Sequence, residues 1–272
     1  MALSVQNNVS AMNAYRNLSN TQNDLSSSLE KLSSGFRINR AADDAAGLAI
    51  SEGLRSQIGG LNVAVRNAQD GISVVQTAEG ALTETHAILQ RMRDLSVQAS
   101  NTGALSDTAK TNIQAEITEL AAGLDDIAAQ TQFNGRALLY GTYTGQTFQV
   151  GANAGEVITV NIGTAMSSTG LGVNALDVVT NASTAITTLD TAIDTVSKVR
   201  AELGAKQNRL DHTINNLQVS VENLTASESR IRDTDMANEM VSYTSANILQ
   251  QAGTSMLAQA NQMPQSILSL LR

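Results

Sequence analysis

Apolar residues recur with a heptad period over a long stretch in the second half of the chain. Between residues 186 and 231 they fill eleven of the fourteen positions reached by alternating steps of three and four. A seam sustained over this length is typical of a coiled-coil helix rather than of a short amphipathic helix. At 1.5 Å per residue, the predicted helix is about 70 Å long.

The first half of the chain carries two more seams of the same kind. From Ile58 to Leu89 eight of ten seam positions are apolar, and His86 occupies one of the two exceptions. From Ile113 to Ile127 every seam position is apolar. Residues 101–107 contain Asn, Gly and Asp, which indicate a loop followed by a helix start. We therefore expect two long helices and one short helix side by side, with His86 as a core or pairing residue rather than a ligand.

The middle of the chain loses the helical period. Residues 148–150 and 157–162 alternate between apolar and polar types, as strands do, and a turn rich in Gly and Asn separates them. The pair Asn134 and Gly135 adds a tight-turn signal. We expect a small β-hairpin region at about 133–162 and a short variable loop at about 163–182. Within that loop Ser167, Ser168 and Thr169 are expected to face solvent.

The two ends of the chain each carry an apolar stripe of helical period. Residues 244–271 contain no charged side chain, and Gln, Asn and Ser supply the polarity instead. A neutral amide face avoids the desolvation cost of ions, so such a helix suits burial among other helices. Isolated helices of this length are marginal in water, and we expect the ends to gain order by packing against copies of themselves. The residues assigned to this polymerisation core are Leu18, Leu25, Leu29, Leu32, Leu249, Met256, Leu257, Met263, Ile267 and Leu270.

Other interpretations of the ends stay open at this point. The two stripes could simply pair within one chain and extend the bundle. A secreted translocator or adhesin-like protein could lay its neutral helices on a membrane, although interfacial helices usually carry Lys or Arg on their polar face. No stretch approaches eighteen consecutive apolar residues, and residues 1–15 lack the pattern of a signal peptide. That would place the protein in the cytosol unless export uses a route without a cleaved signal.

Composition and charge narrow the functional classes. Lys and Arg number 17 against 25 Asp and Glu, a net charge of −8 that disfavours nucleic-acid binding. With no Cys and two His, we expect no metal site, and we expect no cofactor. The carboxylates of Asp43 and Asp44 are adjacent, so on a helix they would not face each other, and a capping or linker role is favoured. Residues 170–175 match a G-x-G-x-x-A pattern without the required βαβ context. The chain is therefore predicted to be a structural protein and not an enzyme.

Five colinear blocks give the chain a specific family resemblance. The blocks are 32–39 (Leu-Ser-Ser-Gly-Phe-Arg-Ile-Asn) with 43–50, 70–73 with 77–82, 89–95 (Leu-Gln-Arg-Met-Arg-Asp-Leu), 131–135 with 148–153, and 249–254 with 257–261 and 268–272. In all five the chain resembles bacterial flagellin, and the resemblance extends over essentially the whole chain except residues 163–182.

The resemblance implies a fold and an assembly. It implies a mainly α protein, a long antiparallel coiled-coil-like bundle with a small β-hairpin element, in a minimal form without projecting outer domains. Residues 1–44 and 232–272 would form an inner coiled-coil domain that orders on assembly, and residues 45–231 an outer helical shell. The activity implied is self-assembly into the extracellular flagellar filament, after export by the flagellar type III apparatus, in support of swimming.

The resemblance also implies partners. These are other copies of the chain, an export chaperone, the filament cap and the hook–filament junction proteins, with neither nucleic acid nor membrane insertion. A vertebrate Toll-like receptor is a further possible partner. The chaperone would bind Met256, Leu257, Met263 and Ile267. The outer-shell contact and the receptor surface would be formed by Gln90, Arg91, Leu95 and Glu116.

Overall fold

The computed structural model describes the backbone of residues 7–270 and the side chains of residues 7–263. The chain forms two compact units, Met1–Ser56 with Asn223–Arg272, and Gln57–Glu222. We call them the terminal unit and the central unit. Two long helices, α2 (Ala45–Ala99) and α4 (Ala182–Arg232), have residues in both units. The predicted inner and outer domains, divided at residues 44/45 and 231/232, stay a prediction.

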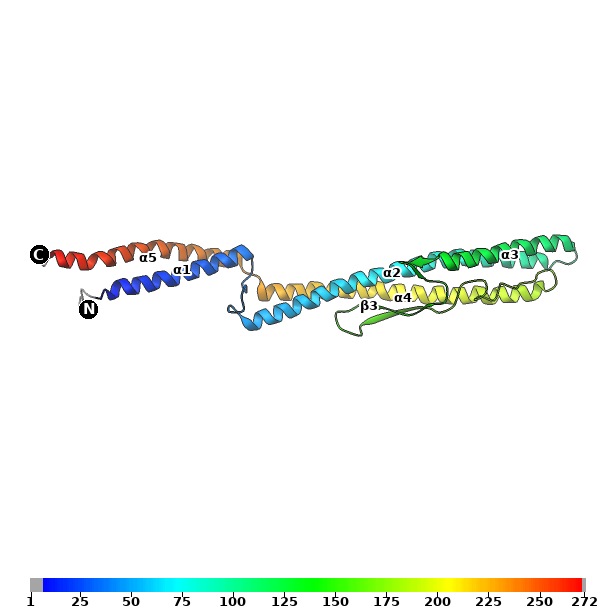
Figure 1. The fold of residues 1–272 in the computed structure, drawn as a ribbon, viewed down its shortest axis with the longest axis horizontal. Coiled ribbons are helices and arrows are strands. Elements are labelled where there is room, and N and C mark those ends of the chain that lie inside the picture. Colours follow the sequence, from blue (N-terminus) through cyan, green and yellow to red (C-terminus); the bar gives the residue numbers. More distant parts are fainter. Residues whose placement is uncertain (1–6, 271–272) are drawn as a thin grey trace. The chain divides into compact units, whose positions relative to one another are not determined.

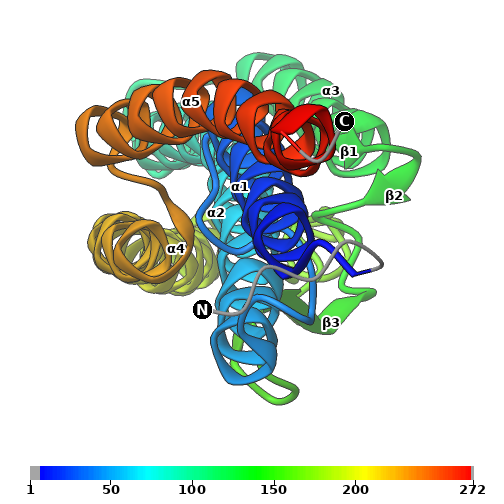
Figure 2. The same ribbon diagram turned by 90° about the vertical axis from the view of Figure 1, so that its left-hand side faces the viewer.

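The terminal unit is built on an antiparallel pair of helices, α1 (Val9–Ser34) and α5 (Met236–Leu270). Figures 1 and 2 show the two as neighbours. The amide of Asn8 donates to the carbonyl of Ala260 at 2.7 Å, and Gln250 donates to Gln22 at 3.0 Å, so the start of α1 lies beside the distal part of α5. Gly253 packs against the Leu18 side chain. The structure thus shows the alternative in which the two ends pair within one chain, and order gained by packing against other copies stays a prediction.

Residues just beyond α1 and α4 are tied together by backbone bonds. Phe36 and Asp233 form an isolated antiparallel bridge, and the Thr234 amide donates to the Gly35 carbonyl at 2.9 Å. The guanidinium of Arg232 lies 4.6 Å from the centre of the Phe36 ring and 3.0 Å from a carboxylate oxygen of Glu52. Gly35 ends α1 with a φ of +77°, the left-handed conformation that glycine adopts without strain. We call this arrangement the clasp.

The adjacent carboxylates of Asp43 and Asp44 both accept backbone amides, Asp44 as a helix cap and Asp43 within the linker that precedes α2. Asp44 accepts the Gly47 amide at 2.8 Å, which satisfies a free donor in the first turn of α2. Asp43 accepts the amides of Arg40 and Asn39, at 2.9 and 3.0 Å, and these bonds lower the pKa of its carboxyl group. The predicted capping or linker role of this pair is confirmed, with Asp44 as the cap and Asp43 in the linker.

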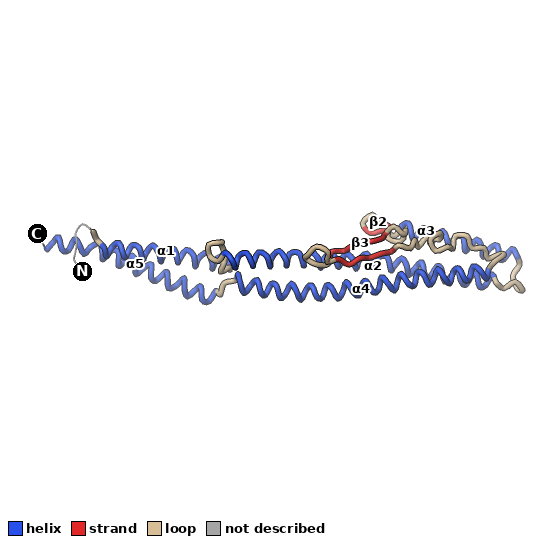
Figure 3. Tube along the Cα trace, turned by 90° about the horizontal axis from the view of Figure 1, so that it is seen from below, coloured by secondary structure: helices blue, strands red, loops and turns tan. Residues whose placement is uncertain are grey.

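The central unit packs α3 (Asp107–Gln130) against α2 and α4, as Figures 1 and 3 show. The seam positions form one apolar core, which contains Leu82, Leu89, Ile117, Leu124 and Leu189 among its fully buried side chains. Ser106 caps the start of α3, as the loop signal at 101–107 predicted. His86 is half-buried, and its Nε2 lies 2.9 Å from Gln90.

Two antiparallel strand pairs occupy the predicted hairpin region. A tight pair, β1 (Gln132–Phe133) with β2 (Arg136–Ala137), turns at Asn134 and Gly135, both with positive φ. The longer pair, β3 (Tyr143–Gln149) with β4 (Val157–Ile162), lies against α2. There the side chain of Asn67 donates to the Gln149 carbonyl at 3.0 Å. The mainly α fold with a small β element is confirmed.

The loop at 163–182 is packed rather than loose. Met166, Val173 and Val178 are buried in the core of the central unit. The Ser168 amide and hydroxyl donate to the two carboxylate oxygens of Asp125, at 2.7 and 2.8 Å, and Ser168 is buried. The expectation that Ser168 faces solvent is wrong, because this carboxylate draws the loop onto α3.

Candidate functional site

The paired terminal helices keep a second apolar surface that their own contact does not cover. Many large apolar side chains on both helices are between 45% and 70% exposed, although helices in water normally turn polar residues outward. We call these residues the uncovered apolar surface: Val9, Met12, Tyr15 and Leu29 on α1, and Met236, Met240, Val241, Ile248, Leu249, Met256 and Met263 on α5.

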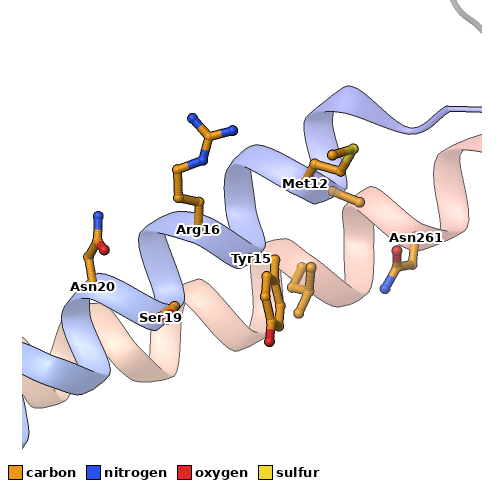
Figure 4. Close-up of a pocket in the computed structure, with 8 residues that line it drawn as sticks. Met12, Tyr15, Arg16, Ser19, Asn20 and Asn261 are labelled. Carbon is orange, nitrogen blue, oxygen red and sulfur yellow. The ribbon is translucent and has the colours of Figure 1, made fainter.

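Two grooves run along this pair of helices. The first, of about 570 Å³, is lined by residues that include Met12, Tyr15 and Arg16 of α1 and Leu257 of α5. Figure 4 shows the Tyr15 ring lying toward α5 while Arg16 points away from it. The second groove, of about 400 Å³, has residues of both helices in its lining as well, and it shares none with the first. It includes Leu18, Leu249 and Met256.

Charge is almost absent from this part of the terminal unit. Along α1 from Val9 to Leu29 the charged residues are Arg16 and Asp24, and α5 has none from Met240 to Met263. Burying neutral amides and hydroxyls costs far less than burying ions, provided that they find hydrogen-bond partners. The surface is therefore suited to contact with another apolar and amide-rich helical surface.

The structure divides the predicted polymerisation residues into two groups. Leu18, Leu25, Leu32 and Leu257 are half-buried within the chain, whereas Leu29, Leu249, Met256 and Met263 are exposed. The side chains of Ile267 and Leu270 lie outside the described residues. On α5 the residues least exposed beside α1 include Ala246, Gly253 and Ala260, spaced by seven. This stripe of small residues was the signal that sequence analysis passed over.

The predicted outer-shell residues lie on the central unit. Arg91 of α2 contacts one carboxylate oxygen of Glu116 on α3 through Nη2 at 2.6 Å and Nε at 3.0 Å, and both side chains are exposed. Gln90 is exposed beside them. Leu95 does not belong to this surface, because its side chain is 2% exposed and packs in the core. That placement corrects the prediction of Leu95 as a contact residue.

Comparison with known proteins identifies the family to which the five sequence blocks belong. The model of the bacterial flagellin N-terminal helical region matches residues 5–144, and that of the C-terminal helical region matches residues 186–271. The flagellin of Bacillus subtilis strain 168 is 52% identical over an alignment of 303 positions, covering 98% of this chain and 99% of that protein.

Two further similarities concern a filament protein and a solved structure. The flagellar filament 33 kDa core protein of Treponema phagedenis is 50% identical over 286 positions, with coverage of 98% and 99%. The crystal structure of Bacillus cereus flagellin is 34% identical and has a TM-score of 0.50, over 56% of this chain and 88% of that one.

Fold and surface together define a helical coiled-coil structural protein. The chain belongs to the bacterial flagellin family. Its 272 residues, with a loop of some twenty residues between β4 and α4, fit a minimal form of that family. In the described part of the chain, no helix combines the length and apolar character that a membrane span requires.

Proposed function

We propose that the protein is exported by the flagellar type III apparatus, polymerises into the extracellular flagellar filament and so supports swimming. The observation that carries this proposal is the uncovered apolar surface of the α1–α5 pair. A chain that functioned alone would leave this surface in water, whereas a polymer of identical chains would bury it.

The free energy available from burying this surface favours contact with several neighbouring copies over contact with one. Completing the burial of each half-exposed Leu, Met or Tyr side chain contributes about 1 kcal/mol or more. Eleven such side chains would together contribute on the order of 10 kcal/mol, which is comparable to the cost of about 4–15 kcal/mol for immobilising one molecule on another. This sum counts all eleven side chains, so a single neighbour that covers only some of them gains less, and several neighbours are needed to bury the whole surface. We expect assembly to depend steeply on concentration.

We propose roles for the two units on the same grounds. Residues 1–44 and 232–272 would form the inner tube, and residues 45–231 the outer shell. Gln90, Arg91 and Glu116 would contact neighbouring copies along the shell, and the same surface would be available to a vertebrate Toll-like receptor. Leu95 would support this surface from below. An Arg91→Ala variant that assembles and signals like the wild type would contradict this role.

We also propose that an export chaperone covers α5 before secretion. Met256 and Met263 are exposed, whereas Leu257 is half-buried beside α1. A chaperone that binds the two exposed methionines together with Leu257 and Ile267 would have to separate α5 from α1. Removing residues 253–272 should abolish both chaperone binding and polymerisation, and a truncated chain that still polymerises would contradict the proposal.

The central test is polymerisation of purified full-length protein in a precipitating salt, observed by negative-stain electron microscopy. We expect the wild type to form long uniform tubes. Met256→Leu keeps the apolar side chain and should do the same, whereas Met256→Lys places a charge on the surface to be buried and should remain monomeric. Monodisperse wild-type particles at every concentration, or tubes of Met256→Lys, would refute the proposal.

Export and swimming need a test in cells. The gene should restore swimming to a bacterium that lacks its own flagellin, and the Met256→Lys gene should not. Dye-loaded liposomes provide the contrast with a membrane-active protein, because leakage caused by the wild-type monomer would favour that alternative.

A further inference from the structure

Two charged residues of α1, Arg16 and Asp24, make no hydrogen bond or ion pair through their side chains within the described residues. Arg16 lines the first groove beside Met12 and Tyr15, and its guanidinium makes no hydrogen bond or ion pair within the described residues. Asp24 is exposed on the same helix and is likewise unpaired there. They are one cation and one anion on an otherwise neutral stretch.

Near the end of α1 three carboxylates are already engaged, whereas the ammonium of Lys31 makes no ion pair within the described residues. Glu30 pairs with Arg40 at 2.9 Å, and Asp43 and Asp44 accept backbone amides. Arg16 lines the first groove and Asp24 lies one turn beyond the α1 residues that line the second, and these two are the charged residues between Val9 and Leu29.

Arg16 and Asp24 cannot pair with each other within one chain. They are eight residues apart on a continuous helix, which separates them by about 12 Å along the axis. Side chains on a helix meet at spacings of three and four residues. An ion pair between them therefore requires two copies of the chain.

Assembly makes this pairing consequential. If neighbouring copies fill the first groove, Arg16 loses water, and a charge buried without a partner costs several kcal/mol. We propose, building on the function proposed above, that Arg16 of one copy forms an ion pair with Asp24 of a neighbouring copy. This ion pair selects the register in which the apolar surfaces meet.

Apolar contact alone does not fix the register in which two copies meet. Burial of apolar area is non-directional, and Met side chains adapt to several packings, so the uncovered apolar surface alone would accept many registers. Two copies placed side by side without a shift would bring Arg16 against Arg16, and like charges repel. A shift along the helix that brings opposite charges together is favoured over the others.

The test uses four full-length proteins: wild type, Arg16→Asp, Asp24→Arg and the double swap. Both positions are on the exposed side of α1, so circular dichroism of the monomers should be unchanged. We expect each single variant to raise the critical concentration for polymerisation at least tenfold, which corresponds to about 1.4 kcal/mol. The double swap has the wild-type net charge and should return to within about threefold of it.

Mixing the two single variants gives a stricter measurement. In the mixture, the carboxylate introduced at position 16 of one variant can meet the guanidinium introduced at position 24 of the other, and the unchanged Arg16 can meet the unchanged Asp24. The mixture should therefore polymerise at concentrations where neither variant does alone. Any of three results would refute the proposed ion pair. The single variants could polymerise like the wild type, the double swap could polymerise no better than the single variants, or the mixture could fail to polymerise. Absence of filaments from the wild type would refute the proposed function, whereas filaments from the wild type and equally from the single variants would refute only the ion pair. The two failures are therefore distinguishable.

Discussion

Replacing Leu95 by alanine is expected to destabilise the central unit rather than to weaken an external contact. The side chain is 2% exposed and belongs to the core built by α2, α3 and α4. The family resemblance alone placed it on a surface with Gln90 and Arg91. The two views predict different outcomes for the same variant.

The magnitude follows from burial. Leu→Ala removes the equivalent of three methylene groups, worth about 2.4 kcal/mol at about 0.8 kcal/mol each. The cavity left behind raises the loss to about 3–4 kcal/mol, since helices packed on several sides collapse only partly. For a domain of roughly 150–250 residues, each kcal/mol lowers Tm by about 2–4 °C, so the expected shift is about 6–16 °C.

Thermal and urea unfolding of the monomer, followed by circular dichroism, measure this loss. Val97→Ala is the matched control, because Val97 lies on the same helix and is 48% exposed. Its effect should stay within about 0.5 kcal/mol. If Leu95→Ala unfolded like Val97→Ala but polymerised poorly, Leu95 would be a contact residue and the reasoning from burial would be refuted.

Three further predictions test local features. Asp125→Ala leaves the amide and hydroxyl of Ser168 without acceptors and should destabilise the packed 163–182 loop by about 2 kcal/mol. Hydrogen exchange at the Ser168 amide should become faster in this variant and stay unchanged in the control Asp126→Ala. Gly47→Ala places a methyl group against the capping carboxylate and should cost about 1–3 kcal/mol, measured by proteolysis at the start of α2; unchanged cleavage would contradict this. Backbone bonds lower the pKa of Asp43 from its ordinary 3.8, so its stabilising contribution is present above that value and lost as pH falls through the folded pKa. Asp43→Asn should therefore flatten the acid limb of the stability curve, and an unchanged limb would count against this account.

The long elements were predictable because their pattern is redundant. The seam of α4 repeats over more than six heptads, so a few polar exceptions do not obscure it. The turn at Asn134 and Gly135 was predictable for a local reason, since both residues tolerate positive φ. The caps at Ser106 and Asp44 follow from equally local chemistry.

Features that depend on contacts between residues far apart in the sequence, such as which face of α5 packs on α1, were not predictable in the same way. On α5 two stripes compete, and the one with the large residues Leu249, Met256 and Met263 is the more conspicuous in the sequence. The chain instead brings the small residues Gly253 and Ala260 beside α1, since small side chains let two helices approach closely.

The clasp and the packed loop had no periodic signal at all. A single backbone bridge between Phe36 and Asp233 uses groups that every residue carries. The bond from Ser168 to Asp125 joins residues 43 positions apart, with nothing in the local sequence to mark it. Only the three-dimensional structure brings these groups together.

The pairing of α1 with α5 sets an order of events for a newly made chain. Asn8 bonds Ala260 across 252 residues, and Gln22 bonds Gln250 across 228, so the first helix to be synthesised receives its partner last. Contacts of such high separation are slow to form, because the whole intervening chain must be closed into a loop. Until residues near 250 are in place, α1 has no helix of its own chain to lie against. The completed pair is thus a signature of a full-length molecule, and any surface built on it distinguishes finished chains from fragments.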